Sequence, residues 1–300
     1  MTAPEIDTVR VTVDGVGVRV RVRGPVTAPP LLLLHGIGRS LEDWQAAQDL
    51  LADRFHVIAM DLPGFGFTEP LPTRPDLRSF ARAAYDVLDA LGEPRPVTVL
   101  GNSLGGAVAM TMATTTPSRV AGLVLVCSAG FGREQRVDLR PTALAAFVTL
   151  PVLGPRFRRW ARAATETANR RIFADPNLMT EQMLAHSSKV AARPGYRRHF
   201  LATGRSIALP VLGFHPRWRR RLLDAVRAAE TPVFVVWGLR DRILPAKQYW
   251  NALRLLPNAR GHLFPESGHM PQLEQPGPFT DTVRDFLDRV GATAASRRSS

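Results

Sequence analysis

The sharpest signal of covalent chemistry in this chain is Ser103, in the sequence Gly101-Asn102-Ser103-Leu104-Gly105-Gly106. The apolar run 97–100 predicts a strand just before this G-x-S-x-G pattern, and a helical pattern over 104–116 follows it at once. Between a strand and a helix such a serine sits on a strained turn that exposes its hydroxyl, and the glycines allow the two elements to cross closely. The pattern therefore predicts a nucleophile. The alternative is a serine that only caps a helix of small residues.

A serine hydroxyl is a weak nucleophile unless a base takes its proton, so the chain must also supply a histidine. Of the seven histidines, only His35 and His269 lie at the ends of predicted strands. We expect His269 to be the base and His35 to hold its own loop through hydrogen bonds. The candidate acid that orients the imidazole is Asp241, in the loop after a predicted buried strand. The alternative for Asp241 is a surface ion-pair cluster with Arg240 and Arg242.

The elements that must position these residues can be read from the apolar pattern. Residues 8–23 alternate between apolar and polar around Asp14-Gly15, which is typical of a β-hairpin. Apolar runs without alternation predict strands buried on both faces, at 31–34, 55–60, 97–100, 120–126, 233–237 and 261–264. Helical patterns occur at 41–53, 76–91, 104–116, 246–255 and 279–290. This order predicts an α/β protein with a mostly parallel central sheet.

The alternation of strands and helices stops over residues 131–230, where no convincing strand is visible. This segment contains arginine-rich pieces of helical character, separated by prolines. It holds 19 basic and 7 acidic residues, whereas the other 200 residues hold 20 and 19. Almost all of the net charge of +13 therefore belongs to one segment. We predict a core of residues 1–130 and 231–293, a helical cap of residues 131–230, and a flexible tail at 294–300.

Taken together and in order, the motifs of this chain resemble those of the α/β-hydrolase fold superfamily over nearly its whole length. The motifs are His35-Gly36-Ile37-Gly38, Asp61-Leu62-Pro63-Gly64-Phe65-Gly66, the turn around Ser103, and Asp241 followed by His269. The resemblance implies an α/β-hydrolase fold with a helical cap over the site, and the chain order Ser, Asp, His is the order of that family. It also implies an oxyanion hole made by the backbone N–H groups of Ile37 and Leu104. The residues that would support these motifs are His35, Gly36, Gly101 and Gly105.

The activity that this resemblance implies is acyl transfer to water by a carboxylic ester hydrolase of the esterase or lipase type, without a metal or an organic cofactor. Asn102 also resembles the turn of C–C bond hydrolases that act on aromatic ring-fission products. Those enzymes usually have a longer glycine-rich loop and a tryptophan after the catalytic histidine, whereas this chain has Ile37 and Met270 at these places. We therefore favour an ester substrate. A C–C bond hydrolase, a thioesterase and a non-catalytic binding protein are the alternatives.

The amino-acid composition excludes several classes of protein. Apolar residues make up 45% of the chain and charged residues 22%, which excludes wholesale disorder. The single cysteine, Cys127, excludes an internal disulfide framework and a cysteine-based zinc site. The N-terminus has neither a basic segment nor an apolar segment of a secretory signal, so we expect a cytoplasmic protein.

The cap is expected to determine the substrate specificity. The substrate would be a small-molecule ester or another carbonyl compound of apolar or anionic character. The candidate lining residues of an apolar acyl pocket are Phe147, Leu150, Leu153, Phe157 and Trp160. The alternative, which is favoured for most of them, is that they pack the cap onto itself. The basic runs 156–160 and 217–221 would allow transient contact with an anionic membrane surface, although a solvated helical face is the commoner explanation of such runs. No nucleic-acid-binding motif accompanies the charge, so no nucleic-acid partner is expected. The sequence leaves the oligomeric state open.

Overall fold

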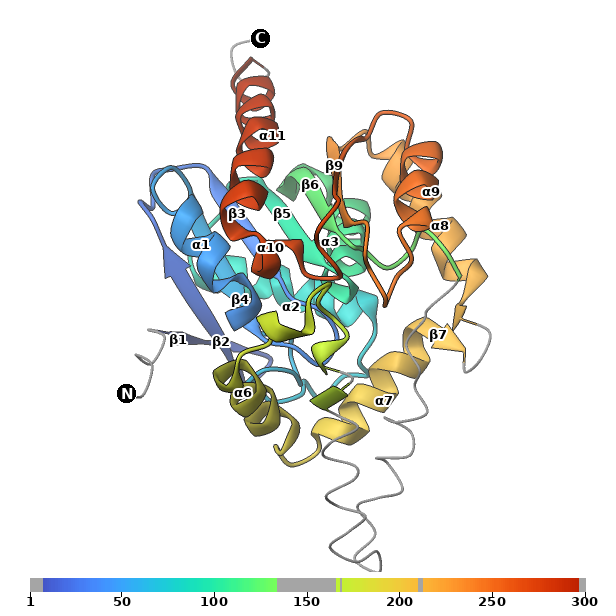
Figure 1. Ribbon diagram of the computed structural model, residues 1–300. Helices are drawn as coiled ribbons and strands as arrows, with labels where there is room; N and C mark the ends of the chain where they lie inside the picture. The colour runs from blue at the N-terminus through green and yellow to red at the C-terminus, as the bar shows by residue number, and fades with distance from the viewer. Residues whose placement is uncertain (1–7, 134–165, 168, 210–212, 297–300) are drawn as a thin grey trace, which may run out of the picture.

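The computed structural model describes residues 8–133, 166–167, 169–209 and 213–296. In this part of the chain, an eight-stranded sheet has the strand order β1-β2-β4-β3-β5-β6-β9-β10 (Figure 1). Only the pairs β1–β2 and β2–β4 are antiparallel, so six neighbouring strands run parallel. The strands are β1 (Val9–Val13), β2 (Val16–Arg23), β3 (Pro30–Leu34), β4 (His56–Met60), β5 (Val97–Asn102), β6 (Val120–Val126), β9 (Val233–Gly238) and β10 (Arg260–Phe264).

Helices cover both faces of this sheet, as Figure 1 shows. One apolar cluster joins one face to α1 (Gln45–Leu51) and α11 (Pro276–Ser296). The other face packs against α2 (Leu77–Ala90), α3 (Leu104–Thr115), α8 (Pro216–Ala228) and α9 (Lys247–Leu255). The central strands are buried on both sides because each face is covered, which explains their uninterrupted apolar runs. Shorter helical turns occur at Leu41–Trp44, Pro117–Arg119, Pro176–Leu178 and α10 (Pro271–Glu274).

The predicted α/β architecture with a mostly parallel sheet is confirmed, with small differences at element ends. The helix predicted at 41–53 is a 3₁₀ turn followed by the shorter α1. The closing helix α11 is longer than the predicted 279–290 and begins at Pro276. Two very short strands, β7 (Ala208–Leu209) and β8 (Gly213–Phe214), lie where the sequence shows no convincing strand. Two residues are too few to show an alternating pattern.

The insertion between β6 and β9 contains the described helices α6 (Glu181–Ala191), α7 (Tyr196–Ile207) and α8. Helix α8 packs on α3, with Leu222, Leu223 and Val226 buried in the same apolar cluster as the sheet. It therefore serves as the crossover helix between two parallel strands of the core. Helices α6 and α7 contact the loops that follow β3 and β4. The residues predicted to line an acyl pocket, 147–160, lie outside the described residues.

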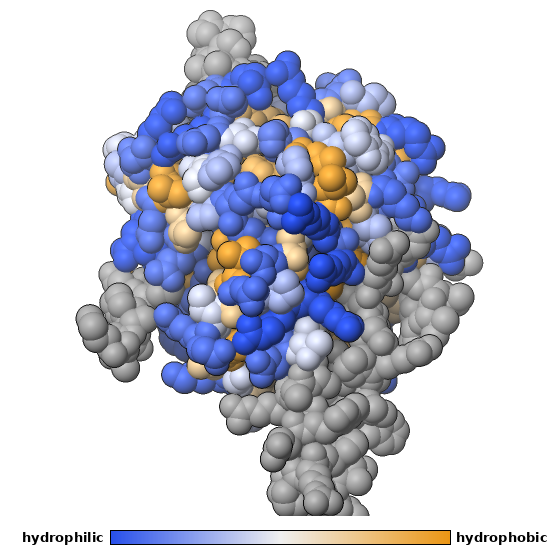
Figure 2. All heavy atoms as spheres, viewed as in Figure 1, coloured by the Kyte–Doolittle hydropathy of each residue, from blue (hydrophilic) through white to orange (hydrophobic). Residues whose placement is uncertain are grey.

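No described helix combines the length and the apolar character that crossing a bilayer requires. On the face shown in Figure 2 hydrophilic residues predominate, and apolar residues form separate patches between them.

Because α3 packs closely on the sheet, alanine substitutions at Gly105 and Gly204 should change the free energy of unfolding in opposite directions. A Cβ at Gly105 would lie 2.3 Å from the carbonyl oxygen of Leu34, whereas a Cβ at Gly204 in α7 would meet nothing within 4 Å. Gly105→Ala should lower the free energy of unfolding by about 1–3 kcal/mol, because the backbone must move to admit the methyl group. Gly204→Ala should raise it by about 0.5–1 kcal/mol, since alanine favours the helix. Urea denaturation followed by circular dichroism measures both, and equal stabilities would contradict the packing argument.

Candidate active site

Ser103 lies on the turn between β5 and α3, with φ 55° and ψ −113°. Its backbone N–H donates to the carbonyl oxygen of Val126 at 3.0 Å, and its own carbonyl oxygen accepts from the N–H of Ala129 at 3.0 Å. A non-glycine residue held at positive φ carries strain of about 1–3 kcal/mol, and such strain persists where the surroundings impose it. The side chain makes no capping hydrogen bond to α3, so Ser103 does not act as the N-cap that the alternative interpretation required.

The glycines around Ser103 are explained by close contacts between backbones. A Cβ at Gly101 would lie 2.3 Å from the carbonyl oxygen of Gly105. A Cβ at Gly105 would strike the carbonyl oxygen of Leu34 at the same distance, and one at Gly106 would strike the hydroxyl of Ser128. Larger residues would push α3 away from the sheet and relax the turn that exposes the serine.

His269 and Asp241 form a buried pair at the carboxyl ends of β10 and β9. The Nδ1 atom of His269 is 2.8 Å from Oδ2 of Asp241, and each residue is only 5% exposed. The other oxygen, Oδ1, accepts from the backbone N–H groups of Ile243 at 2.7 Å and Leu244 at 2.9 Å. An ionised carboxylate can only accept hydrogen bonds, so Nδ1 carries the proton and Nε2 is left as the basic nitrogen.

The histidine loop is tied to the serine turn through Asn102. Its Nδ2 donates to the carbonyl oxygen of His269 at 3.0 Å and to that of Val126 at 3.2 Å. Among the described residues no hydrogen bond joins Ser103 Oγ to His269. Catalytic hydrogen bonds are often long without substrate and shorten in the complex, so this geometry does not argue against proton transfer between the two.

The backbone N–H groups of Ile37 and Leu104 are the two donors that the family resemblance implies for an oxyanion hole. Neither has an acceptor within the described ranges, and Leu104 begins α3, where the helix dipole favours negative charge. A Cβ at Gly36 would lie 3.4 Å from the Cβ of Ser103, so the loop that carries Ile37 adjoins the serine turn.

His35 holds the start of that loop from inside the core. Its Nε2 accepts from the N–H of Leu62 at 2.9 Å, and its Nδ1 lies 2.7 Å from the carbonyl oxygen of Gly36. Burial lowers the pKa of His35, so the ring is neutral, with Nδ1 as donor and Nε2 as acceptor.

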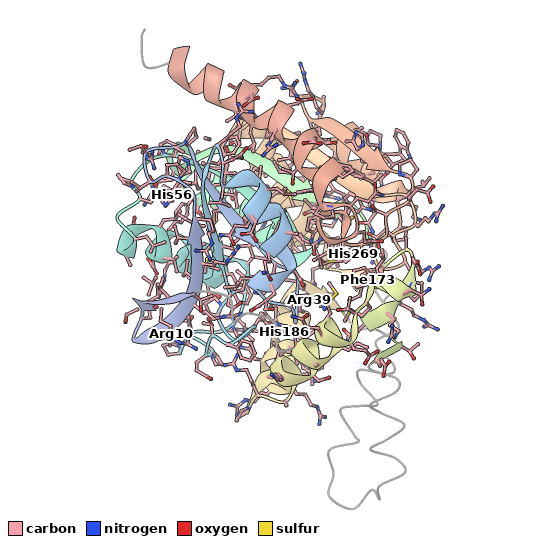
Figure 3. The ribbon with its side chains drawn as sticks, turned by 60° about the vertical axis from the view of Figure 1, so that its left-hand side comes forward. Arg10, Arg39, His56, Phe173, His186 and His269 are labelled. Atoms are coloured by element: carbon pink, nitrogen blue, oxygen red, sulfur yellow. The ribbon has the colours of Figure 1, made fainter. Side chains whose placement is uncertain are left out.

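The structure also shows a residue that the sequence analysis missed. The Glu274 carboxylate accepts from the N–H groups of Gly268 at 2.9 Å and Met270 at 3.1 Å, on either side of His269. It also accepts from the N–H of Ala174 at 2.8 Å, in the insertion. The carbonyl oxygen of Ile172 accepts from the N–H of His269 at 2.9 Å, and Figure 3 shows the neighbouring Phe173 close to His269. No motif marks Glu274, because its partners are backbone groups that only the fold brings to it.

One group of possible metal ligands includes two of these residues. Single ligand atoms of Cys127, Asp241 and His269 lie within 4.8 Å of one another. The Asp–His separation of 2.8 Å is a hydrogen bond and is shorter than the separation of two ligands on one zinc ion, about 3.3 Å. Burial raises the pKa of the Cys127 thiol well above its usual value, which opposes the thiolate that a metal needs. The group therefore fits a neutral thiol beside an Asp–His pair better than a metal centre.

The surface ion-pair cluster considered for Asp241 is not formed by that residue. Arg240 pairs with Glu266, which is 66% exposed in its side chain. Asp241, its neighbour in the chain, has its side chain fully buried and turned toward His269.

Comparisons with known proteins show the family and the fold of this chain. The sequence profile of a family described as alpha/beta hydrolase fold matches residues 29–276. The 2-hydroxymuconate semialdehyde hydrolase of Pseudomonas sp. (strain CF600) is 28% identical, over 93% of this chain and 94% of its own length. The dihydrolipoyllysine-residue acetyltransferase component of the acetoin cleaving system of Pseudomonas putida is 34% identical, over 86% of this chain and 63% of its own length.

Among solved structures, 2-hydroxy-6-oxo-6-phenylhexa-2,4-dienoate hydrolase from Rhodococcus sp. strain RHA1 is similar, with a TM-score of 0.77 and 24% identity. The match covers 95% of this chain and 99% of that one. At this level of identity the likeness concerns the fold.

The Asp241–His269 pair leads to a prediction with a matched control. Asp241→Asn should leave the fold intact and lower turnover near neutral pH by a factor of about 10⁴, because an amide in that place favours the wrong imidazole tautomer. Glu266→Gln, an exposed carboxylate change nearby, should leave turnover unchanged. Steady-state kinetics of the two variants decide, and a loss confined to Glu266→Gln would transfer the acid role to that residue.

Proposed function

Because this chain belongs to the α/β hydrolase fold family, we propose that it is a serine hydrolase that cleaves carboxylic esters with Ser103, His269 and Asp241. The observation that carries the proposal is the serine held at φ 55° between β5 and α3, at the same sheet edge as the buried His269–Asp241 pair. A family fold alone would not suffice, since one fold hosts many activities. The residues at this edge supply a nucleophile, a base, an orienting acid and two unoccupied backbone donors.

In the first half of the proposed reaction, Ser103 Oγ attacks the carbonyl carbon of the ester while His269 Nε2 accepts the hydroxyl proton. The carbonyl oxygen becomes an oxyanion, and the N–H groups of Ile37 and Leu104 stabilise it. Each such donor is worth about 3–4 kcal/mol in the transition state. His269 then gives its proton to the leaving alcohol as the C–O bond breaks, and an acyl-enzyme remains.

In the second half, water replaces the alcohol. His269 Nε2 takes a proton from the water as its oxygen attacks the acyl carbon, and the same backbone donors stabilise the second oxyanion. When this intermediate collapses, the bond between the acyl carbon and Ser103 Oγ breaks, His269 Nε2 gives its proton to Oγ, and a carboxylic acid is released. Asp241 stays ionised throughout, keeps the proton on Nδ1, and stabilises the imidazolium in each half-reaction.

A C–C bond hydrolase is the second candidate. The observation that favours it is the likeness to 2-hydroxymuconate semialdehyde hydrolase over nearly the full length of both chains. The Ile37 and Met270 positions differ from the usual pattern of such enzymes, which keeps the ester proposal first. In both cases the substrate is a small carbonyl compound.

Ser103→Ala tests the proposed function. Turnover should fall by a factor of about 10⁴–10⁶, because the nucleophile and its base act as one unit. The purified wild-type protein should react with a fluorophosphonate probe, and Ser103→Ala should not. The substrate panel should contain p-nitrophenyl esters of graded length, a thioester and a ring-fission product. Preferred turnover of the ring-fission product would favour the second candidate, whereas a Ser103→Ala variant with wild-type turnover would remove Ser103 from the mechanism.

The basic insertion leads to a salt-dependence prediction. On α8, Arg220 and Arg221 are exposed, whereas Arg219 donates its Nε–H to the carbonyl oxygen of Gly130 at 2.9 Å. If this charge attracts anionic substrates, kcat/KM for an anionic ester should fall as ionic strength rises beyond about 0.1 M, where charges are screened over ~10 Å. Replacing both exposed arginines with glutamine should reduce that dependence and leave a neutral short ester unaffected. Equal, flat salt profiles for an anionic and a neutral ester would contradict electrostatic attraction.

A further inference from the structure

The loop that carries Ile37 is held by the insertion as well as by the core. Helix α7 begins at Tyr196, whose hydroxyl donates to the carbonyl oxygen of Gly38 at 3.1 Å. Gly38 has φ 74°, and the N–H of Arg39 donates to the carbonyl oxygen of Gly36, which closes a tight turn over 36–39. The Tyr196 hydroxyl therefore binds this turn at Gly38, one residue after Ile37, whose N–H is the proposed oxyanion donor.

The first turns of α7 leave no space above Gly38. A Cβ at Gly38 would lie 2.7 Å from the Tyr196 hydroxyl and 2.8 Å from the ring of Phe200. Tyr196 is only partly exposed, and burial raises its pKa to about 12. The phenol therefore remains protonated and able to donate at any working pH.

The same helix rests on the loop that follows β4. The ring of His199 lies against Gly64, and the ring of Phe65 meets the rings of Tyr196 and His199 edge to face, at 6.3 and 5.0 Å. This second loop contains Leu62, whose N–H donates to His35 at the start of the first loop. Helix α7 thus contacts both loops whose mutual hydrogen bond sets the position of residues 35–38.

Helix α6 adds a second attachment on the far side of the turn. Arg39 reaches the hydroxyl of Ser187 at 3.4 Å, and His186 Nε2 lies 2.8 Å from the hydroxyl of Ser40. Figure 3 shows Arg39 and His186 close together where α6 meets the core. Of these hydrogen bonds from α6 and α7, only the Tyr196 bond acts on the backbone of the turn. The core holds the two ends of the turn, because the Arg39 carbonyl oxygen accepts from the N–H of Gly66 at 3.0 Å and His35 Nδ1 lies 2.7 Å from the Gly36 carbonyl oxygen.

We propose that Tyr196 is a positioning residue that sets the oxyanion hole, so that the seating of α7 on the core governs the chemical step. By holding the Gly38 carbonyl, the phenol fixes the turn over 36–39 and aims the Ile37 N–H at the developing oxyanion. If α7 moves away from the core, its hydrogen bond to the Gly38 carbonyl breaks. The oxyanion hole then lacks a correctly oriented Ile37 N–H until α7 packs on the core again. The inference rests on the proposed function, because it assigns a role within the same reaction.

Tyr196→Phe tests this inference, because phenylalanine keeps the ring packing and removes only the donor. With a substrate that the wild-type protein turns over, kcat should fall about tenfold while KM changes less than about twofold, as expected for an interaction made in the transition state. Affinity for a trifluoromethyl ketone, whose adduct with Ser103 carries an oxyanion, should fall by a similar factor.

The matched control is Tyr85→Phe. The Tyr85 hydroxyl also donates to a backbone carbonyl, that of Met112, at 2.7 Å, but it lies between α2 and α3, remote from the turn over 36–39. This variant should lose stability without a change in kcat or in ketone affinity.

Two results would overturn the inference alone: wild-type kcat and ketone affinity in Tyr196→Phe, or a rise in KM without a loss of kcat. A wild-type protein that turns over neither esters nor ring-fission products, and that does not react with fluorophosphonate, would overturn the proposed function and this inference with it.

Discussion

The close crossing of β5 and α3 is the constraint on which the rest of this structure depends. Backbone contacts at Gly101 and Gly105 bring the helix so near the sheet that Ser103 must adopt a positive φ. The buried core of apolar strands and helices supplies the stability that offsets this local strain. The same crossing places the N-terminus of α3 directly beside the hydroxyl that would react, and the Leu104 N–H there has no acceptor among the described residues.

The parallel sheet then gathers the remaining groups. Since parallel strands end at one edge, the loops after β3 and β10 reach the turn that carries Ser103, and the loop after β9 reaches His269. Each polar group at this edge is held by others: Asp241 by two backbone N–H groups, His269 by Asp241, and the loop of His269 by Asn102 and Glu274. Such preorganisation limits how far the groups must move when charge develops.

The insertion contributes to this order through contacts with the loops of the core. Through Ile172 and Ala174 it contacts the loop of His269, and through α7 it contacts the loops after β3 and β4. Residues of the insertion therefore contact both the loop of His269 and the loop that carries Ile37. In the proposed mechanism, a change in the position of the insertion would therefore alter the chemical step.

The sequence by itself determined the strands of the central sheet, the core helices outside the insertion and the motif around Ser103, because each depends on residues within a few positions of one another. It also placed Asp241 and His269 after strands whose carboxyl ends meet, which made their pairing predictable. The roles of Glu274 and Tyr196 were decided only by the tertiary structure. Glu274 meets Ala174 across 100 residues, and Tyr196 meets Gly38 across 158. Their partners are backbone groups, which every residue carries, so no side-chain pattern identifies them and only packing selects which ones come within hydrogen-bond distance.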